Sequence, residues 1–402
     1  MNKTGKERLW TKDFTLIIII NFLVFMNHIM ILNTFPMFLE TLNMDEGIAG
    51  MCAFAFSVVA VVLRPFIGWL LNNGKRKSIL IIGIAGMFLM PLGYIISGKI
   101  AAMGYALVSA VTLAIICRML QGAALAFSNT TTATIASDAL PQKRFAEGMG
   151  YFGMATALAT SIAPALSLKL IKVSFELMYV IASLFMVLAF VLYLVMKTNA
   201  TVPEKKIQLS AKGLIDKDAV PASVICLVFL LTYGALENFL SKFAVEYNLP
   251  SGGIFFLITA VMLILVRFLL GSLADKMGEG IFVYTCNAAM FTAFLLLAFV
   301  PNNITFYVAA VLAGYAFGGI EPALQSMAVH IAPPERRGSA NSTFLCAYDI
   351  GLGGGGGIAG VLIASMGYSN MFVIVGLATV ISVLLYFFWG RKHPSSLKYK
   401  AE

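Results

Sequence analysis

The chain has 402 residues, of which 60% are hydrophobic and only 12% are charged. Soluble domains carry about 45–50% apolar residues and about 25% charged ones, so this composition has too few charged side chains to cover a water-exposed surface. A soluble protein is therefore excluded. At about 20 apolar residues per crossing, the hydrophobic content suffices for roughly twelve membrane spans.

Hydropathy windows of about 19 residues predict six spans in each half of the sequence. The first six are 14–35, 47–71, 78–97, 104–128, 148–171 and 175–196. The second six are 219–240, 251–274, 281–300, 303–330, 338–365 and 370–390. The longest polar stretch, 197–218, separates the two sets.

We therefore predict an all-α membrane protein with twelve transmembrane helices in two pseudo-symmetric six-helix bundles. The N-terminal bundle comprises 1–196, a cytoplasmic linker follows over 197–218, and the C-terminal bundle with its short cytoplasmic tail comprises 219–402.

Lysine and arginine are unevenly distributed over the predicted loops. With a cytoplasmic N-terminus, 21 of the 28 fall on the cytoplasmic side, and by the positive-inside rule both termini are then cytoplasmic. We expect a multi-pass protein of the cell (inner or plasma) membrane that works as a monomer. The basic charge belongs to the membrane surface, so nucleic acid is not expected as a partner.

Two segments recur at equivalent places in the two halves. The segment 64–70 at the end of the second span resembles 267–273 at the end of the eighth, 203 residues later. Likewise, 141–144 after the fourth span resembles 334–337 after the tenth. Such repetition indicates a parallel duplication, which places a cavity at the interface of the two bundles.

The repeated loops resemble those of the major facilitator superfamily, and particularly of its twelve-span drug:proton antiporter branch. The family signature, approximately Gly-x-Leu-Ala-Asp-Arg-x-Gly-Arg-Lys, is similar to 271–278. The first copy, 68–77, has Asn72 in place of the acid and its second glycine one position early. The resemblance covers the whole chain and implies transport by rocking of the two bundles.

Two further family motifs lie inside spans. The fourth-span motif Arg-x-x-x-Gly, with Gln before the glycine, resembles 118–122. The antiporter motif of the fifth span, centred on Gly-Pro, is only loosely matched by Gly153 and 163–165.

The loop motifs predict gates between the bundles. Glycine at a helix end allows close approach of another helix, and an acid or Asn can bond the amides at a helix start. Alternatively, basic residues such as Arg76 simply obey the topology rule. The gating candidates are Arg64, Gly68, Asn72, Arg76, Arg267, Gly271, Asp275 and Gly278.

Ionisable side chains inside spans are costly and usually functional. The proton-coupling candidates are Glu321, Asp349, Arg118, Glu237 and His28. Glu321 and Asp349 lie about ten residues from the loop they share, near the membrane midplane. They are the expected proton carriers, although a buried pair that fixes helix packing is the alternative.

The other three candidates have two interpretations each. Arg118 stays charged and either biases a neighbouring carboxylate, as the family resemblance implies, or holds a substrate anion. Glu237 is an outer gate or an interfacial residue, and His28 is a core histidine or a proton relay.

Polar and aromatic side chains predict the surroundings of the substrate. The substrate-binding candidates are Asn21, Asn27, Gln121, Tyr151, Tyr233, Asn238, Tyr315, Gln325 and Tyr348. With 21 methionines and 31 phenylalanines, they suggest an adaptable apolar pocket.

Cofactor motifs are not expected. The spacing G-x-G-x-x-G at 351–356 follows no strand, and the sequence contains no P-loop for ATP. The five cysteines have no metal-ligand spacing. We therefore expect no cofactor, no metal site, no ATP and no enzymatic activity.

The sequence favours a secondary active transporter that exports small, lipophilic compounds in exchange for protons. An importer, or a dedicated exporter of a single metabolite, peptide or metallophore, is the alternative. A membrane-embedded enzyme is a remote one.

Overall fold

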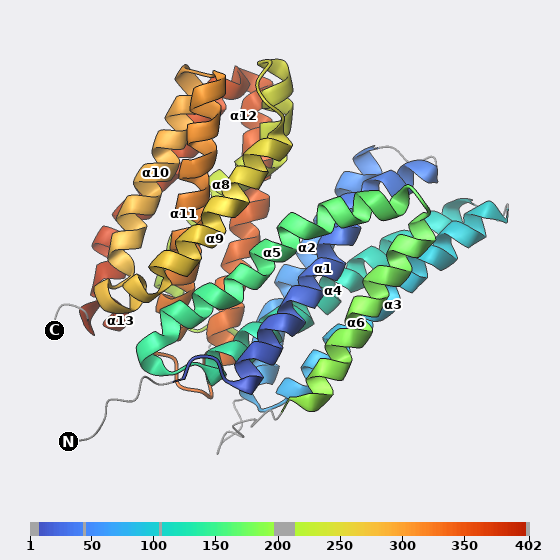
Figure 1. Cartoon of the computed structure of the whole chain (residues 1–402), viewed down its shortest axis with the longest axis horizontal. Coiled ribbons are helices and arrows are strands. Elements are labelled where there is room, and N and C mark those ends of the chain that lie inside the picture. Colours follow the sequence, from blue (N-terminus) through green and yellow to red (C-terminus); the bar gives the residue numbers. More distant parts are fainter. Residues whose placement is uncertain (1–7, 43–45, 104–106, 197–213, 399–402) are drawn as a thin grey trace. The chain divides into compact units, whose positions relative to one another are not determined.

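The computed structural model describes residues 8–42, 46–103, 107–196 and 214–398 (Figure 1). Within these ranges the chain is helical, and eleven helices are long and apolar enough to cross a membrane. The last of them, α12 (Arg337–Phe388), has 52 residues. At 1.5 Å per residue it would be about 78 Å long, far beyond the roughly 30 Å hydrocarbon core.

Gly367 resolves this excess of length. Its φ of 78° and ψ of 175° are non-helical and divide α12 into two helices. This backbone region is essentially confined to glycine. The described chain therefore contains the twelve membrane helices that the sequence predicts, and the break falls between the predicted spans 338–365 and 370–390.

The remaining helix bounds follow the predicted spans, and most helices extend several residues beyond them. The first half contains α1 (Lys12–Thr41), α2 (Glu46–Asn72), α3 (Arg76–Ala102), α4 (Leu107–Ala139), the 3-10 turn η1 (Gln142–Arg144), α5 (Phe145–Ile171) and α6 (Phe175–Val195). The second half contains α8 (Val220–Glu246), α9 (Gly252–Met277), α10 (Glu279–Phe299), α11 (Asn303–Val329), α12, η2 (Gly390–Lys392) and α13 (Pro394–Lys398).

Local signals fix several helix starts. Ser174 caps α6 by accepting a hydrogen bond from the Leu177 amide at 3.0 Å. Asn302 and Thr305 form a reciprocal capping box at the start of α11. Such caps satisfy amides that would otherwise lack partners at the helix end.

The chain forms two compact units. One contains residues 10–139 and 155–209, and the other contains 1–9, 140–154 and 210–402. The division of the chain into bundles at 1–196 and 219–402 stays a prediction.

In the first unit, α3 packs on α4 and α6, α2 packs on α4, and α1 packs on α4 and α6. In the second unit, α10 packs on α11 and α12, α9 packs on α11, and α8 packs on α11 and α12 (Figure 1). The helices α8, α9, α10 and α11 correspond in order to α1, α2, α3 and α4, and the part of α12 after Gly367 corresponds to α6. With this correspondence, each pairing of the first unit recurs in the second.

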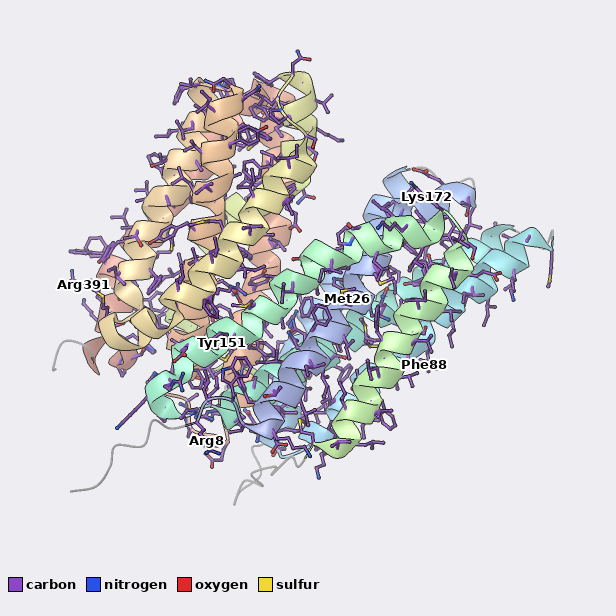
Figure 2. All side chains as sticks on the ribbon, viewed as in Figure 1. Arg8, Met26, Phe88, Tyr151, Lys172 and Arg391 are labelled. Atoms are coloured by element: carbon purple, nitrogen blue, oxygen red, sulfur yellow. The ribbon has the colours of Figure 1, made fainter. Side chains whose placement is uncertain are left out.

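The first unit has large apolar side chains both in its interior and on its outer surface; Met26 is labelled in Figure 2. Met26 belongs to a buried core in the first unit, together with Phe35, Tyr94 and Tyr179. Large apolar side chains such as Leu184, 56% exposed, face outward. Helices that are apolar on both faces suit a lipid environment.

Candidate transport site

The second unit contains a partly buried ion pair between two residues that the sequence singles out. The guanidinium of Arg267 on α9 is paired with the carboxylate of Glu321 on α11. Arg267 is only 4% exposed. An ideal Cβ on Gly153 of α5 would lie 2.3 Å from Arg267 Nη1, so the missing side chain at this glycine makes room for the guanidinium.

Further predicted residues gather around this pair. The Tyr233 ring on α8 stacks on Phe317 of α11, with centroids 3.9 Å apart. Tyr348 on α12 lies within electrostatic range of both Glu321 and Glu237. The structure therefore brings two proton-coupling candidates and two substrate-binding candidates together in one unit, although their roles stay predictions.

Other candidates of the second unit have local partners. The Asn238 amide donates to the Gly234 carbonyl at 2.8 Å, and the Tyr315 hydroxyl donates to Thr285 at 2.9 Å.

Gln325 and Tyr151, the remaining substrate-binding candidates outside the first unit, contact neighbouring elements. The proton-coupling candidate Asp349 lies on α12. Gln325 donates to Asn341 Oδ1 at 3.5 Å. Tyr151 on α5 meets the Phe268 ring edge to face, with centroids 6.4 Å apart. Asp349 on α12 is half-buried.

The first unit contains a different buried cation. Arg118 on α4 is 1% exposed, and its Nη1 donates to Gln121 Oε1 at 2.8 Å. Its guanidinium also lies over the rings of Phe35 and Phe56, at 5.1 and 4.5 Å from their centroids. Among the side chains that the structure describes, no carboxylate forms an ion pair with Arg118.

The contacts of Arg118 bring no negative charge to it. A cation–π contact contributes about 0.5–2 kcal/mol, whereas leaving a buried charge uncompensated costs about 3–5 kcal/mol. Several buried polar atoms near it have no hydrogen-bond partner among the described residues: Arg118 Nε, Gln121 Nε2, His28 Nδ1 and Tyr179 Oη. The arrangement is a fixed positive site surrounded by unused polar groups.

The polar residues of α1 connect helices. Asn21 donates to Thr156 at 3.1 Å and accepts from Thr132 at 2.9 Å. Asn27 donates to the carbonyls of Met87 and Ala182 at 3.2 and 2.8 Å. These contacts give both asparagines a helix-packing function, and substrate binding by them stays a prediction.

His28 belongs to the same region as Arg118. Its ring stacks on Phe56, with centroids 5.2 Å apart, and it lies within electrostatic range of Arg118 and Arg64.

Two gating candidates make interhelical contacts in the first unit. Arg64 Nη1 on α2 donates to Thr130 of α4 at 3.2 Å. This contact runs from the second to the fourth helix, as does the Arg267–Glu321 contact in the second unit. Arg76 at the start of α3 forms an ion pair with Asp138 of α4 at 2.8 Å.

The other gating candidates lie in or beside the interhelical loops. Asn72 is buried at the end of α2, and Gly68 lies one turn before it. Gly278 separates α9 from α10 with a φ of 78°. The surroundings of Gly271 and of the Asp275 side chain lie outside the part of the structure that is described.

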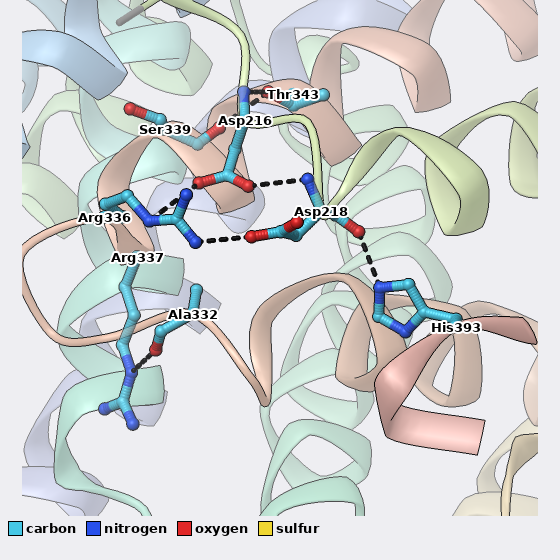
Figure 3. A network of polar contacts seen from close by, with 8 residues as sticks. All are labelled: Asp216, Asp218, Ala332, Arg336, Arg337, Ser339, Thr343 and His393. Carbon is cyan, nitrogen blue, oxygen red and sulfur yellow. Dashed lines mark hydrogen bonds and ion pairs between the residues drawn. The ribbon is translucent and has the colours of Figure 1, made fainter. Parts of the chain in front are cut away.

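A network on Arg336 was not expected from the sequence (Figure 3). Arg336 precedes α12 and pairs with Asp218, while its Nε lies 3.6 Å from Asp216. The Asp216 amide donates to Thr343 Oγ1 at 3.0 Å, and His393 Nε2 lies 2.8 Å from the Asp218 carbonyl oxygen. The network joins the end of the linker to α12 and to the C-terminal segment.

The charges of this network shift each other's protonation. Burial raises the pKa of Asp216, against the opposing effects of Arg336 and of the Asp218 amide. Burial lowers the pKa of Arg336, but its hydrogen bond to Asp218 and the charge of Asp216 raise it more in total. The repeated segment 334–337 was the only sequence signal at this place.

Comparison with known proteins agrees with this architecture. A model of the Major Facilitator Superfamily matches residues 17–298 and 253–402. The chain belongs to the Major Facilitator Superfamily. It is therefore a membrane transporter of that superfamily, as the loop motifs imply.

Relatives of this superfamily member differ in how much of it they match. A staphylopine export protein of Staphylococcus aureus is 23% identical over 91% of this chain and 93% of its own. An uncharacterised transporter of the same type from Burkholderia mallei is 26% identical over 38% of each chain.

Solved structures share the fold. A bacterial homologue of the iron transporter ferroportin, in the outward-facing state with soaked iron, has a TM-score of 0.78 at 14% identity. The match covers 94% of this chain and 99% of that one. The human organic anion transporter MFSD10 has a TM-score of 0.73 at 15% identity, covering 93% and 98%. At these identities the likeness establishes the fold alone.

Proposed function

We propose that this transporter exports a small molecule in exchange for protons, with Glu321 as the proton carrier. The observation that carries the proposal is the ion pair between the buried Arg267 and the partly buried Glu321. An ionised Glu321 attracts the guanidinium, whereas a protonated one no longer does. Proton binding would thereby loosen α9 from α11, and this change supplies a two-state element for alternating access.

The membrane potential supplies energy for such an exchange. Each proton that enters the cell contributes about 2.3 kcal/mol per 100 mV. Tyr348 and Glu237, which lie in electrostatic range of each other, are candidates for the groups that sense the protonation of Glu321. Asp349 is a second candidate carrier on α12.

Export of one particular compound is favoured over broad drug efflux. The support is the near full-length likeness to a protein whose name gives the export of one compound, staphylopine. A proton-coupled importer is the alternative, since the same buried acid serves either direction. We further propose that both termini face the cytoplasm, as the distribution of Lys and Arg suggests.

Proton exchange is tested with purified protein in liposomes that contain a pH-sensitive dye. An inside-acid gradient is imposed, and tetraphenylphosphonium, 2-naphthoate or iminodiacetate is added outside. We expect one of these probes to release protons with the wild type and with Glu246→Gln, an exposed carboxylate of α8. Glu321→Gln should abolish the release.

Two results would contradict the proposal. One is unchanged proton release by Glu321→Gln, which would remove this residue as the carrier. The other is probe transport by the wild type at the same rate with and without a pH gradient, which would remove proton coupling.

A further inference from the structure

We infer that Arg118 and the polar groups around it bind the carboxylate of a small organic anion, and that this anion is the transported compound. The identification as transported compound rests on the proposed function. The binding site itself rests on unsatisfied, buried hydrogen-bonding groups in the first unit.

The orientation of Gln121 is fixed by two donors. Its Oε1 accepts from Arg118 Nη1 at 2.8 Å and from the Tyr94 hydroxyl at 2.9 Å. A carbonyl oxygen held in this way turns the amide nitrogen away from both donors. In the part of the chain that the structure describes, Gln121 Nε2 then has no acceptor, although the side chain is fully buried.

Two more donors lack acceptors nearby. Arg118 Nε and the Tyr179 hydroxyl are both buried, and neither has a hydrogen-bond partner within residues 8–42, 46–103, 107–196 and 214–398. The rings of Tyr179 and Tyr94 lie 5.2 Å apart, which places this hydroxyl in the same cluster. Buried polar groups are otherwise satisfied in folded proteins, so three unused donors in one cluster indicate a missing acceptor.

The chemistry of these donors selects the ligand. A guanidinium, an amide N–H and a phenol hydroxyl all donate, and Arg118 adds a permanent positive charge. A carboxylate has two oxygens with about four acceptor sites and a negative charge, and it matches the fork of an arginine. A cation would be repelled, and a neutral amide would leave the charge uncompensated.

The surroundings specify an apolar group next to the carboxylate. Phe35, Phe38, Tyr94 and Tyr179 form a continuous set of ring contacts with centroid distances of 5.2–6.4 Å. Phe35 also covers the Arg118 guanidinium. Phe35 and Phe56 cover the guanidinium in this conformation, so a carboxylate reaches Arg118 only after one of these rings moves aside.

His28 completes one side of the site. Its ring stacks on Phe56, the second ring that covers Arg118. Its Nδ1 also has no partner among the side chains and backbone atoms that the structure describes. A ring nitrogen carrying a proton adds a fourth donor toward the anion.

The test is equilibrium binding to the full-length protein in nanodiscs, in a zwitterionic buffer without added chloride and without a pH gradient. The probes are radiolabelled 2-naphthoate, 2-naphthamide and 2-naphthylmethylamine, which share one ring system and differ in charge. We expect the wild type to bind naphthoate at least tenfold more tightly than the other two. Arg118→Gln should lose at least tenfold of that affinity, and Arg118→Lys should keep part of it.

Ser97→Ala is the matched control, because it removes another buried hydrogen-bonding group of the same unit, one that donates to the Ala110 carbonyl at 2.7 Å. It should change naphthoate affinity by less than threefold. If Arg118→Gln does not fold, the inference is tested by Gln121→Leu and by the affinities of the wild type for the three probes of different charge. Gln121→Leu removes the oriented amide and is expected to lower naphthoate affinity several-fold.

Equal binding of the three probes, absence of naphthoate binding, or unchanged affinity in a folded Arg118→Gln protein would overturn the inference. Displacement of naphthoate by chloride in the low millimolar range would assign the site to an inorganic anion and would also overturn it. Because this assay contains no proton gradient, naphthoate binding without proton exchange would refute the proposed function alone. Proton exchange with a different probe, without naphthoate binding, would refute only the inference.

Discussion

The guanidinium of Arg267 and the carboxylate of Glu321 form an ion pair that joins α9 to α11. Glu321→Gln removes the negative charge and leaves the guanidinium buried without compensation. We expect a destabilisation of about 3–5 kcal/mol, seen as a lower Tm in detergent. The double variant Arg267→Gln/Glu321→Gln should recover part of this loss.

The control for this pair is Glu246→Gln, whose exposed side chain should matter by less than about 0.5 kcal/mol. A double variant that is less stable than both single variants would show that the two residues stabilise the fold independently. Their pairing would then not explain the stability.

Gly153 controls the position of Arg267. An alanine there would place its Cβ 2.3 Å from Arg267 Nη1, so the guanidinium must move away from Gly153. We expect Gly153→Ala to cost about 1–3 kcal/mol and to slow proton exchange in liposomes about tenfold. Gly150→Ala is the matched control, because its Cβ would have its nearest neighbour at 3.9 Å. Equal effects of the two substitutions would exclude the contact as the cause.

Asp216 provides a prediction about pH. Burial raises its pKa in the folded state above the unfolded value of about 3.9. A carboxyl group with a raised pKa contributes stability that is complete below pH 3.9 and is lost as the pH rises through the folded pKa. Asp216→Asn should therefore gain stability relative to the wild type as the pH rises from about 3.5 to 7.

Thermal unfolding across this pH range measures the difference, with Asp13→Asn on the first turn of α1 as a comparison. A relative gain of the wild type with rising pH would mean that Arg336 and the Asp218 amide outweigh burial at Asp216.

We expect that replacing Gly367, at the break between the two helices of α12, lowers the stability of the protein. Its φ of 78° and ψ of 175° would cost another residue about 1–3 kcal/mol. Gly357→Ala, in the helical part of the same element and with open space around its Cβ position, should instead gain up to about 1 kcal/mol. Opposite changes in Tm for Gly367→Ala and Gly357→Ala are expected, and a shared sign would contradict the argument.

The fold could be predicted from the sequence because a membrane span is a continuous run of apolar residues. Run length and polar interruptions located the twelve helices, and even the break at Gly367 fell within a predicted loop. The loop motifs predicted the superfamily. The bounds were less accurate, since α4 continues to Ala139, beyond the predicted end at 128, through polar residues that are buried among helices.

The site was only partly accessible, because partner choice depends on packing. Arg267 and Glu321 were both singled out, but as members of different sets, and the sequence contains nothing that joins positions 54 residues apart. Phe35 and Phe56 were indistinguishable from other phenylalanines until their rings were seen over Arg118.

The Arg336 network was missed for a related reason. Asp216 and Asp218 lie at the end of the predicted linker 197–218, and the sequence does not show that the folded chain brings them to Arg336.

In each unit an arginine of the second helix contacts a side chain of the fourth helix, and the two contacts differ in chemistry. Arg64 reaches the hydroxyl of Thr130, whereas Arg267 reaches the carboxylate of Glu321. A single ancestral half would have passed this arginine to both descendants, which then diverged at the residue it touches. The two units therefore differ in chemistry at equivalent positions. Exchanging Thr130 and Glu321 between them would test whether a carboxylate opposite Arg64 acquires the property proposed for Glu321.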